Sequence, residues 1–230
     1  MRKFAAAAGI GVEIRSFSEN VAEQHIIKHI TDLNHEDEIT GIMIQMPLPK
    51  HLNAGCLINA MDYRKDVEGI HNYNLGKLIG GEQGVAPSTP KAVMALLREN
   101  KVPVTGRKVT IIGRSVIVGT PLTILMSREN ATVTLCHSRT RNLNRETSAG
   151  DIVVTAVGKP GFITPDMVTD KTVIIDAGIN VDASGRICGD VHEETCSRAR
   201  LVSAVPGGVG VITVAALFDN LKILHQQKGS

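Results

Sequence analysis

Short apolar runs alternate with segments of helical periodicity along most of the chain. A short apolar run bounded by turn residues is typical of a strand buried in a parallel sheet. Strands that alternate with helices indicate a parallel α/β fold. We predict strands at Val12–Ser16, Ile39–Gln45, Val109–Ile112, Ala131–Cys136, Asp151–Val157, Thr172–Ala177 and Leu201–Ala204.

Three segments carry helix signals. Residues 20–36 place apolar side chains at helical spacing, which predicts an amphipathic helix lying on a small sheet made by the first two strands. Residues 88–100 begin with Thr89 as a possible cap and Pro90 at the first helical position, and we expect this helix to bridge two domains. Residues 213–227 predict a final helix, and the five strands before it are typical of a dinucleotide-binding sheet.

Composition narrows the function. The 230 residues are 43% hydrophobic, enough for one large domain or two small ones. A net charge of +2 without a dense Lys/Arg run argues against nucleic acid or a membrane surface as partner, and 3% aromatic residues without Trp argue against base stacking. No apolar run is long enough to span a bilayer, and no signal peptide is evident. The four cysteines form no CxxC pair, so we expect reduced thiols in a cytoplasmic protein that binds small molecules.

The stretch 113–121, GRSVIVGTP, directly follows an apolar run. Gly113 and Gly119 permit a tight turn and a close approach of a ligand to the backbone, although their spacing departs from GxGxxG. Thr120 and Pro121 are typical of a first helical turn, whose free N–H groups and positive dipole end favour an anion. We predict a phosphate-binding loop; a glycine turn that merely ends a strand is the alternative.

The tip of the next strand favours NADP over NAD. A protein that selects NAD usually has an acidic residue there to hold the ribose hydroxyls. Here the tip is His137, Ser138 and Arg139, and Arg114 lies in the glycine turn. Guanidinium and hydroxyl groups can pair with a 2′-phosphate. The alternative is that Arg114 and Arg139 are solvated surface charges.

Several weaker signals remain. VPGGVG at 205–210 has adjacent glycines that permit close approach to a flat ligand, or simply a turn before a helix. Gln45 ends an apolar run, where ligands bind in open α/β sheets. Asp66 and Glu68 are two residues apart and form no obvious acid/base pair. His25 and His29 have metal-ligand spacing but no evident third ligand, so we expect no metal site.

The motifs IQMPLP, KDVEGIH, PSTP, GRSVIVGTP, VGKPGFI, IDAGIN, GDV and VPGGVG occur in this order. In these motifs the chain resembles the bifunctional methylenetetrahydrofolate dehydrogenase/methenyltetrahydrofolate cyclohydrolase family, from Gly9 to the last helix. The resemblance implies two α/β domains with a cleft between them: a folate-binding catalytic domain over 1–92, a Rossmann-like NADP-binding domain over 93–210, and a C-terminal helix, 211–230, that returns to the first domain. It also implies one-carbon metabolism, tetrahydrofolate derivatives as substrates, and a homodimer.

The resemblance also assigns roles to residues. It matches Gln45 to a glutamine that orients a catalytic lysine, and Glu68 to an aspartate that grips the pterin. The residues matched to the pterin site and the substrate-facing turn are Ile44, Gln45, Met46, Pro206, Gly207, Gly208, Val209 and Gly210. Those matched to NADP are Gly113, Arg114, Ser115, Ser138 and Arg139, with Ile179 beside the nicotinamide.

The folate half departs from the family pattern, whereas the cofactor half follows it. The family's catalytic lysine belongs to a Tyr-x-x-x-Lys helix and lies eight residues before the glycine matched to Gly9, a position that is Met1 here. The tyrosine, and the strand and helices that precede it in the family, would lie before Met1. Glu68 replaces an aspartate, which moves the carboxylate by roughly 1.5 Å. Ser88 replaces a cysteine and Val211 a proline.

These features predict an NADP-dependent methylenetetrahydrofolate dehydrogenase whose cyclohydrolase activity is weak or lost. The alternative is a degenerate relative that binds NADP without folate chemistry, as a regulatory or interaction protein. A reductase that uses the same cleft on another heterocycle is a third reading.

Overall fold

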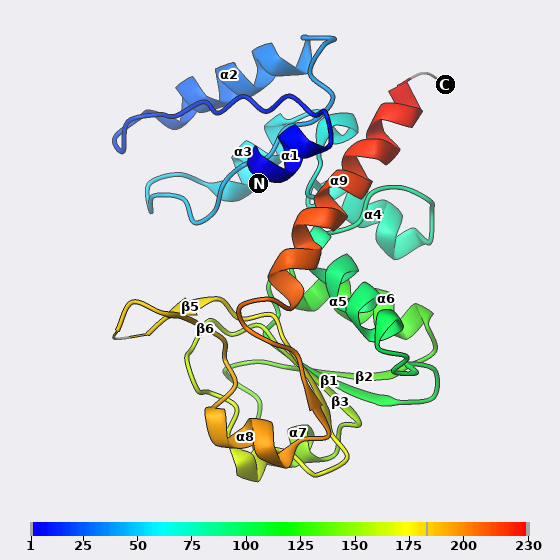
Figure 1. Cartoon of the computed structure of the whole chain (residues 1–230). Helices are drawn as coiled ribbons and strands as arrows, with labels where there is room; N and C mark the ends of the chain where they lie inside the picture. The colour runs from blue at the N-terminus through cyan, green and yellow to red at the C-terminus, as the bar shows by residue number, and fades with distance from the viewer. Residues whose placement is uncertain (1, 183, 229–230) are drawn as a thin grey trace.

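The structure is a computed structural model that describes residues 2–182 and 184–228. Five strands form one parallel sheet in the order β2-β1-β3-β4-β7. Figure 1 labels β1, β2 and β3 of this sheet. They are β1 (Lys108–Ile112), β2 (Thr132–Cys136), β3 (Ile152–Thr155), β4 (Val173–Asp176) and β7 (Leu201–Val202). The five strands predicted for this part of the chain are confirmed, with small shifts at their ends. The strand order reverses between β1 and β3, and ligands of open α/β sheets bind at the carboxyl ends of such strands.

Both faces of this sheet are covered, which explains its apolar strands. In β3, Ile152 and Val154 belong to the core under α5 (Ser88–Glu99) and α6 (Gly119–Arg128). Val153 points the other way, into a second core that includes Met167 of η2 (Pro165–Met167). The remaining elements of this part are α7 (Leu143–Ser148), α8 (Glu193–Arg198) and the hairpin of β5 (Asn180–Val181) with β6 (Ile187–Cys188).

The N-terminal part is built from helices and loops. Its elements are α1 (Arg2–Ala7), α2 (Glu23–Asn34), α3 (Ala54–Ala60), η1 (Tyr63–Lys65) and α4 (Asn72–Gly80). The predicted amphipathic helix is α2, which buries Ile26 and Ile30 against Ile42, Leu57 and Met61.

The two strands predicted in this part are wrong. Over the described residues Val12–Ser16 has no strand partner, and Ile14 is 56% exposed. Ile39–Gln45 makes only an isolated parallel bridge, between Ile42 and Asp66. A β-strand forms only where its backbone pairs with a neighbouring strand. A sequence pattern typical of a strand does not provide that neighbouring strand. Consequently α2 packs on α3 and not on a small sheet.

The start of α5 also differs from the prediction. The helix begins at Ser88 after Pro87, so Thr89 lies in the first turn and is not the cap. The Ser88 N–H donates to the carbonyl oxygen of Glu68 at 3.2 Å. The carbonyl oxygen of Glu68, in the N-terminal part, thus takes the place of a side-chain cap, which α5 does not have.

The last helix, α9 (Val209–Lys228), begins earlier than predicted and lies along α5. In Figure 1 it runs from the parallel sheet, past α4, toward the N-terminal helices. Asn220, which is fully buried, donates from Nδ2 to the carbonyl oxygens of Val67 and Ala86, both at 2.9 Å, and accepts at Oδ1 from Lys91 Nζ at 2.8 Å. Within residues 2–182 and 184–228, no helix has both the length and the apolar character needed to cross a membrane.

Candidate active site

The glycine turn after β1 is wound too tightly for any other residue. Gly113 has φ 112°, and a Cβ there would lie 2.5 Å from the carbonyl oxygen of Ala156. A Cβ on Gly119 would lie 1.7 Å from the carbonyl oxygen of Gly113. The turn therefore packs directly over the carboxyl ends of β1 and β3, where the strand order reverses.

The residues between these glycines leave polar groups at the surface. Arg114 and Ser115 are exposed. Ser115 Oγ accepts a hydrogen bond from the N–H of Val118 at 3.1 Å, immediately before α6. The predicted helix start at Thr120 and Pro121 is confirmed, because α6 begins at Gly119. A ten-residue helix whose N-terminus follows an exposed arginine fits an anionic phosphate group.

The tip of β2 lies beside this turn. The N–H of Gly113 donates to the carbonyl oxygen of Cys136 at 2.9 Å, which continues the parallel pairing of β1 with β2. The His137 side chain fixes the tip, since its Nδ1 accepts a hydrogen bond from the N–H of Arg139 at 3.1 Å. Ser138 and Arg139 are exposed. The structure therefore brings these two residues to the same sheet edge as the glycine turn.

A residue matched to the cofactor meets a residue matched to the substrate at the far end of this edge. Ile179, in the loop after β4, is 70% exposed, and its Cδ1 lies 3.9 Å from the position of a Cβ on Gly210. Gly207 has φ 109°, and a Cβ on Gly208 would lie 2.4 Å from the carbonyl oxygen of Ala204. Pro206, Gly207 and Gly208 form the turn, whereas Val209 and Gly210 already belong to α9.

The carboxyl group of Glu68 is largely shielded from solvent. Its carboxylate accepts a hydrogen bond from the N–H of Ile44. Burial, and next the nearby charge of Asp66, raise the pKa of Glu68 to about 7, against the lowering effect of that hydrogen bond. The structure thus brings Glu68 to the IQMPLP segment. A carboxyl group with this pKa changes charge near neutral pH.

Gln45 and its neighbours lie in the loop after the Ile42 bridge. The Gln45 side chain is exposed and donates from Nε2 to the carbonyl oxygen of Met46 at 3.0 Å. Ile44 and Met46 are half-buried. Because no strand forms here, Gln45 does not stand at a strand end as predicted.

Sequence reasoning assigned no role to Asp66, which organises this region. It is fully buried, with Oδ1 accepting from the N–H of Gly69 at 2.9 Å and Oδ2 from the N–H of His71 at 2.8 Å and Nδ2 of Asn74 at 2.9 Å. These bonds hold the turn that presents Glu68. The D-x-x-G spacing was the available signal. Asp176, Asp190 and Asn220 were likewise missed.

The sequence also singled out His25, His29, Val211 and Met1. His25 and His29 flank the ring of Phe17 in edge-to-face contacts. Val211 is 54% exposed in the first turns of α9. Met1, matched to the family's catalytic lysine, lies outside the described residues.

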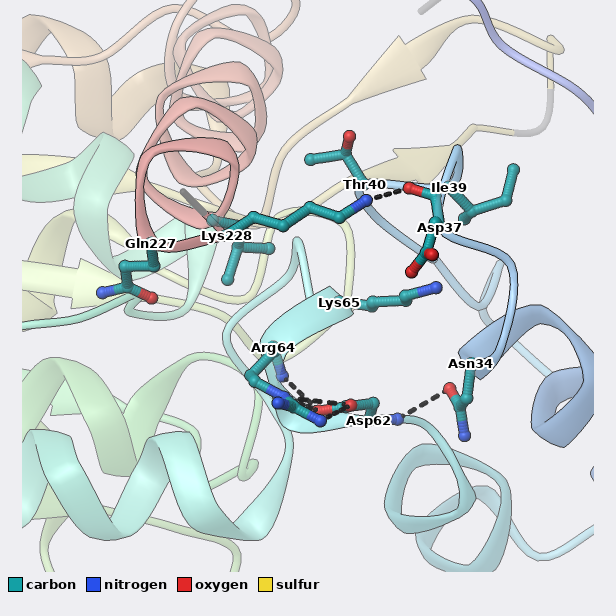
Figure 2. Close-up of a pocket in the computed structure, with 10 residues that line it drawn as sticks. Asn34, Asp37, Ile39, Thr40, Asp62, Arg64, Lys65, Gln227 and Lys228 are labelled. Carbon is teal, nitrogen blue, oxygen red and sulfur yellow. Dashed lines mark hydrogen bonds and ion pairs between the residues drawn. The ribbon is translucent and has the colours of Figure 1, made fainter. Parts of the chain in front are cut away.

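A pocket of about 250 Å³ lies elsewhere, between the end of α2, η1 and the last turn of α9 (Figure 2). Lys65 lines it and donates from Nζ to the carbonyl oxygens of Leu33 and Glu36, both at 2.7 Å. Burial is the main cause that lowers the pKa of Lys65. The lining residues include none of the predicted site residues.

The parallel sheet, its switch point and the glycine turn at a helix N-terminus define a nucleotide-binding α/β protein. Residues 87–228 match the model of the tetrahydrofolate dehydrogenase/cyclohydrolase NAD(P)-binding domain, and residues 1–68 match the catalytic domain of the same family. The chain therefore belongs to the tetrahydrofolate dehydrogenase/cyclohydrolase family, and both domains of that family are represented in it.

Individual relatives agree with this assignment. The chain is 59% identical to bifunctional protein FolD 2 of Syntrophomonas wolfei over 227 residues, which are 99% of this chain and 84% of the relative. The crystal structure of the bifunctional FolD dehydrogenase/cyclohydrolase of Campylobacter jejuni superposes with a TM-score of 0.93 at 35% identity, covering 98% of this chain and 81% of that one. The Trypanosoma brucei FolD structure, complexed with NADP cofactor and inhibitor, gives a TM-score of 0.91 at 32% identity, covering 98% and 80%.

Proposed function

We propose that this chain is an NADP-dependent methylenetetrahydrofolate dehydrogenase in which cyclohydrolase activity is weak or lost. The proximity of Ile179 to Gly210 carries the proposal, because it brings a residue matched to the cofactor beside a residue matched to the substrate. Hydride transfer requires the two reacting faces to be held together in a fixed orientation.

The cofactor end of the site suits a phosphorylated dinucleotide. The Gly113 turn and the N-terminus of α6 would hold the pyrophosphate, since the positive end of the helix dipole favours an anion there. The exposed side chains of Arg114, Ser138 and Arg139 would take the 2′-phosphate. NADP, when bound, accepts a hydride from the methylene carbon of the folate.

The folate end offers Glu68 and the IQMPLP loop. Glu68 would hydrogen-bond the pterin, as the resemblance implies for the aspartate it replaces. Its position is set by the N–H of Ile44 and by the turn that Asp66 holds. Ile44, Gln45 and Met46 would border the pterin, and the turn at Pro206–Gly208 would face it.

Cyclohydrolase chemistry makes a further demand. Water must open the methenyl bridge, and this step requires proton transfer by a group of suitable pKa. The resemblance assigns that duty to a lysine oriented by Gln45. In this 230-residue polypeptide the matched position is Met1, whose side chain carries no transferable proton.

Both activities can be assayed on the same preparation of this polypeptide. Dehydrogenase turnover is followed by NADPH formation from methylenetetrahydrofolate, and cyclohydrolase turnover by loss of methenyltetrahydrofolate above the uncatalysed rate. We expect the first to exceed the second, because the absence of one acid–base group slows the step that needs it by about 100-fold or more. Equal turnovers would contradict the proposal.

One observation favours a second candidate, a relative that binds NADP without folate chemistry. The departures Glu68, Ser88 and Val211 all fall at positions that the resemblance assigns to the folate end, while the cofactor loop follows the family pattern. NADP binding by calorimetry, together with no turnover in either assay, would support this candidate instead.

The resemblance also supports a homodimer acting in the cytoplasm. Sedimentation equilibrium of the purified chain tests the first point: a single species of twice the chain mass is expected, and a concentration-independent monomer would contradict it.

A further inference from the structure

Two buried carboxylates lie at the carboxyl end of β4. Asp176, the last residue of the strand, is 3% exposed, and Asp190, just after β6, is 0% exposed. In the described part of the chain neither forms an ion pair. A buried carboxylate without a cation needs several hydrogen-bond donors to remain ionised. Burial, the largest cause, raises the pKa of Asp176.

Each of the two aspartates packs against a glycine of the segment that carries the other aspartate. A Cβ on Gly178 would lie 2.3 Å from Cγ of Asp190, and a Cβ on Gly189 would lie 2.0 Å from Oδ2 of Asp176. Each carboxylate therefore fills the space beside a glycine of the other segment. Asp176 also accepts from the N–H groups of Gly178 and Val191, both at 2.9 Å.

Asp190 reaches further, to the loop after β3. Its Oδ2 accepts from Thr155 Oγ1 at 3.0 Å and from the N–H of Val157 at 2.8 Å. Its Oδ1 accepts from the N–H of Lys159 at 2.9 Å and from Nδ2 of Asn180, the first residue of β5, at 2.9 Å. One carboxylate thus connects the loop after β3 with the start of β5, directly after Ile179.

The loops after β3 and β4 border the candidate site. The loop after β3 begins at Ala156, whose carbonyl oxygen lies against Gly113 of the glycine turn, and the loop after β4 carries Ile179 next to Gly210. We propose that Asp190 is a positioning residue that fixes Ile179 and the loop after β3 around the nicotinamide end of NADP. This role rests on the proposed function, because it assumes that NADP lies along this sheet edge.

Asp190→Asn is an isosteric test. Each carboxylate oxygen faces donors, so an amide –NH₂ in either orientation leaves donors without an acceptor. The probes are NADP and 2′-phospho-ADP-ribose, which lacks the nicotinamide, titrated calorimetrically into the full chain. We expect the Kd of NADP to rise about tenfold, the usual effect of losing a charged hydrogen bond, and the Kd of 2′-phospho-ADP-ribose to stay within about twofold.

Two further variants complete the test. Asp182→Asn changes an aspartate whose hydrogen bonds stay within its own hairpin, to Ser184 and Arg186, and should alter neither Kd. Thr155→Val removes one donor to Asp190 with little change of shape, and should raise only the Kd of NADP, about threefold. Thr155→Val decides the matter if Asp190→Asn does not fold.

Equal weakening of both nucleotides in Asp190→Asn or Thr155→Val would mean a general structural role and would overturn the proposal, as would no change in either. If the unmodified chain binds both nucleotides but transfers no hydride, the proposed function fails. The comparison of the two nucleotides then still decides the role of Asp190.

Discussion

The carbonyl oxygen of Gly113 occupies the space that a Cβ on Gly119 would need, at 1.7 Å from its position. The glycine turn and the start of α6 are therefore locked against each other by backbone alone. Gly119→Ala must push them apart, and overpacking of this kind costs about 1–3 kcal/mol. We expect that loss in urea denaturation and a fall of NADP affinity by about tenfold or more, measured by calorimetry.

Gly76→Ala is the matched control for that substitution. Gly76 lies inside α4, is exposed, and has no heavy atom within 4 Å of the position that a Cβ would take. Alanine there should stabilise the chain by about 0.5–1 kcal/mol and leave NADP binding unchanged. Equal NADP affinity in the two alanine variants would show that the tight turn is not needed for the cofactor.

The choice between NADP and NAD should depend on the arginines of the two adjacent strand ends. Arg114→Ala combined with Arg139→Ala removes the guanidinium groups that pair with a 2′-phosphate, so the preference for NADP should disappear. Calorimetric Kd values for both nucleotides measure this. Arg107→Ala, an exposed arginine at the opposite end of β1, should keep the preference. An unmodified chain without any preference would refute the assignment.

Glu68 should make stability depend on pH. Its folded pKa of about 7 lies above the ordinary value of 4.5, so between these values the folded state keeps a proton that the unfolded chain loses. The free energy of unfolding therefore falls as pH rises through this window, by at most about 1.4 kcal/mol per pH unit. Glu68→Gln removes this dependence.

The stability gained by Glu68→Gln over the unmodified chain should consequently grow between pH 5 and pH 8 by on the order of 1–3 kcal/mol. Urea denaturation at each pH measures it. Glu38→Gln, at an exposed glutamate, reports the general effect of removing one negative charge. A pH-independent difference for Glu68→Gln would contradict the assigned burial of this carboxyl group.

Asn220 should matter far more for stability than its neighbour Asp219. Asn220→Ala leaves the carbonyl oxygens of Val67 and Ala86 without their donor in a buried place, at a cost of about 2–4 kcal/mol. Asp219→Ala removes an ion pair with Lys91 whose aspartate is 57% exposed, which should cost less than about 1 kcal/mol. Denaturant midpoints that fall equally in both variants would show that Asn220 does not hold α9 in place.

The sequence predicted strands correctly where a segment with a strand pattern also has neighbouring strands to pair with. The strands around Ile111, Val153 and Ile174 are apolar on both faces, and each has a neighbouring strand on either side, so their pattern alone located them. The segment around Ile14 instead alternates apolar and polar residues and has no strand partner among the described residues, and there the pattern misled.

In the candidate site, the roles of the glycines and arginines at strand ends could be predicted from the sequence, because these roles depend on the residues themselves and their immediate sequence neighbours. The donors to Asp66 are local, and its D-x-x-G spacing could have indicated them. The role of Asp190 could not be predicted, because its donors, such as the N–H groups of Val157 and Lys159, lie more than 30 residues away in the sequence. The elevated pKa of Glu68 likewise arises from burial, which only the folded chain supplies.

The last helix has a mechanical consequence. Its 20 residues extend over about 30 Å, and it starts beside Gly208 and ends where Lys228 contacts the carbonyl oxygen of Asp37. Asn220 pins its middle to the segment that leads into Glu68. Because the helix is continuous, a displacement of the turn at Gly207 would be transmitted along α9, past Asn220, toward Lys228.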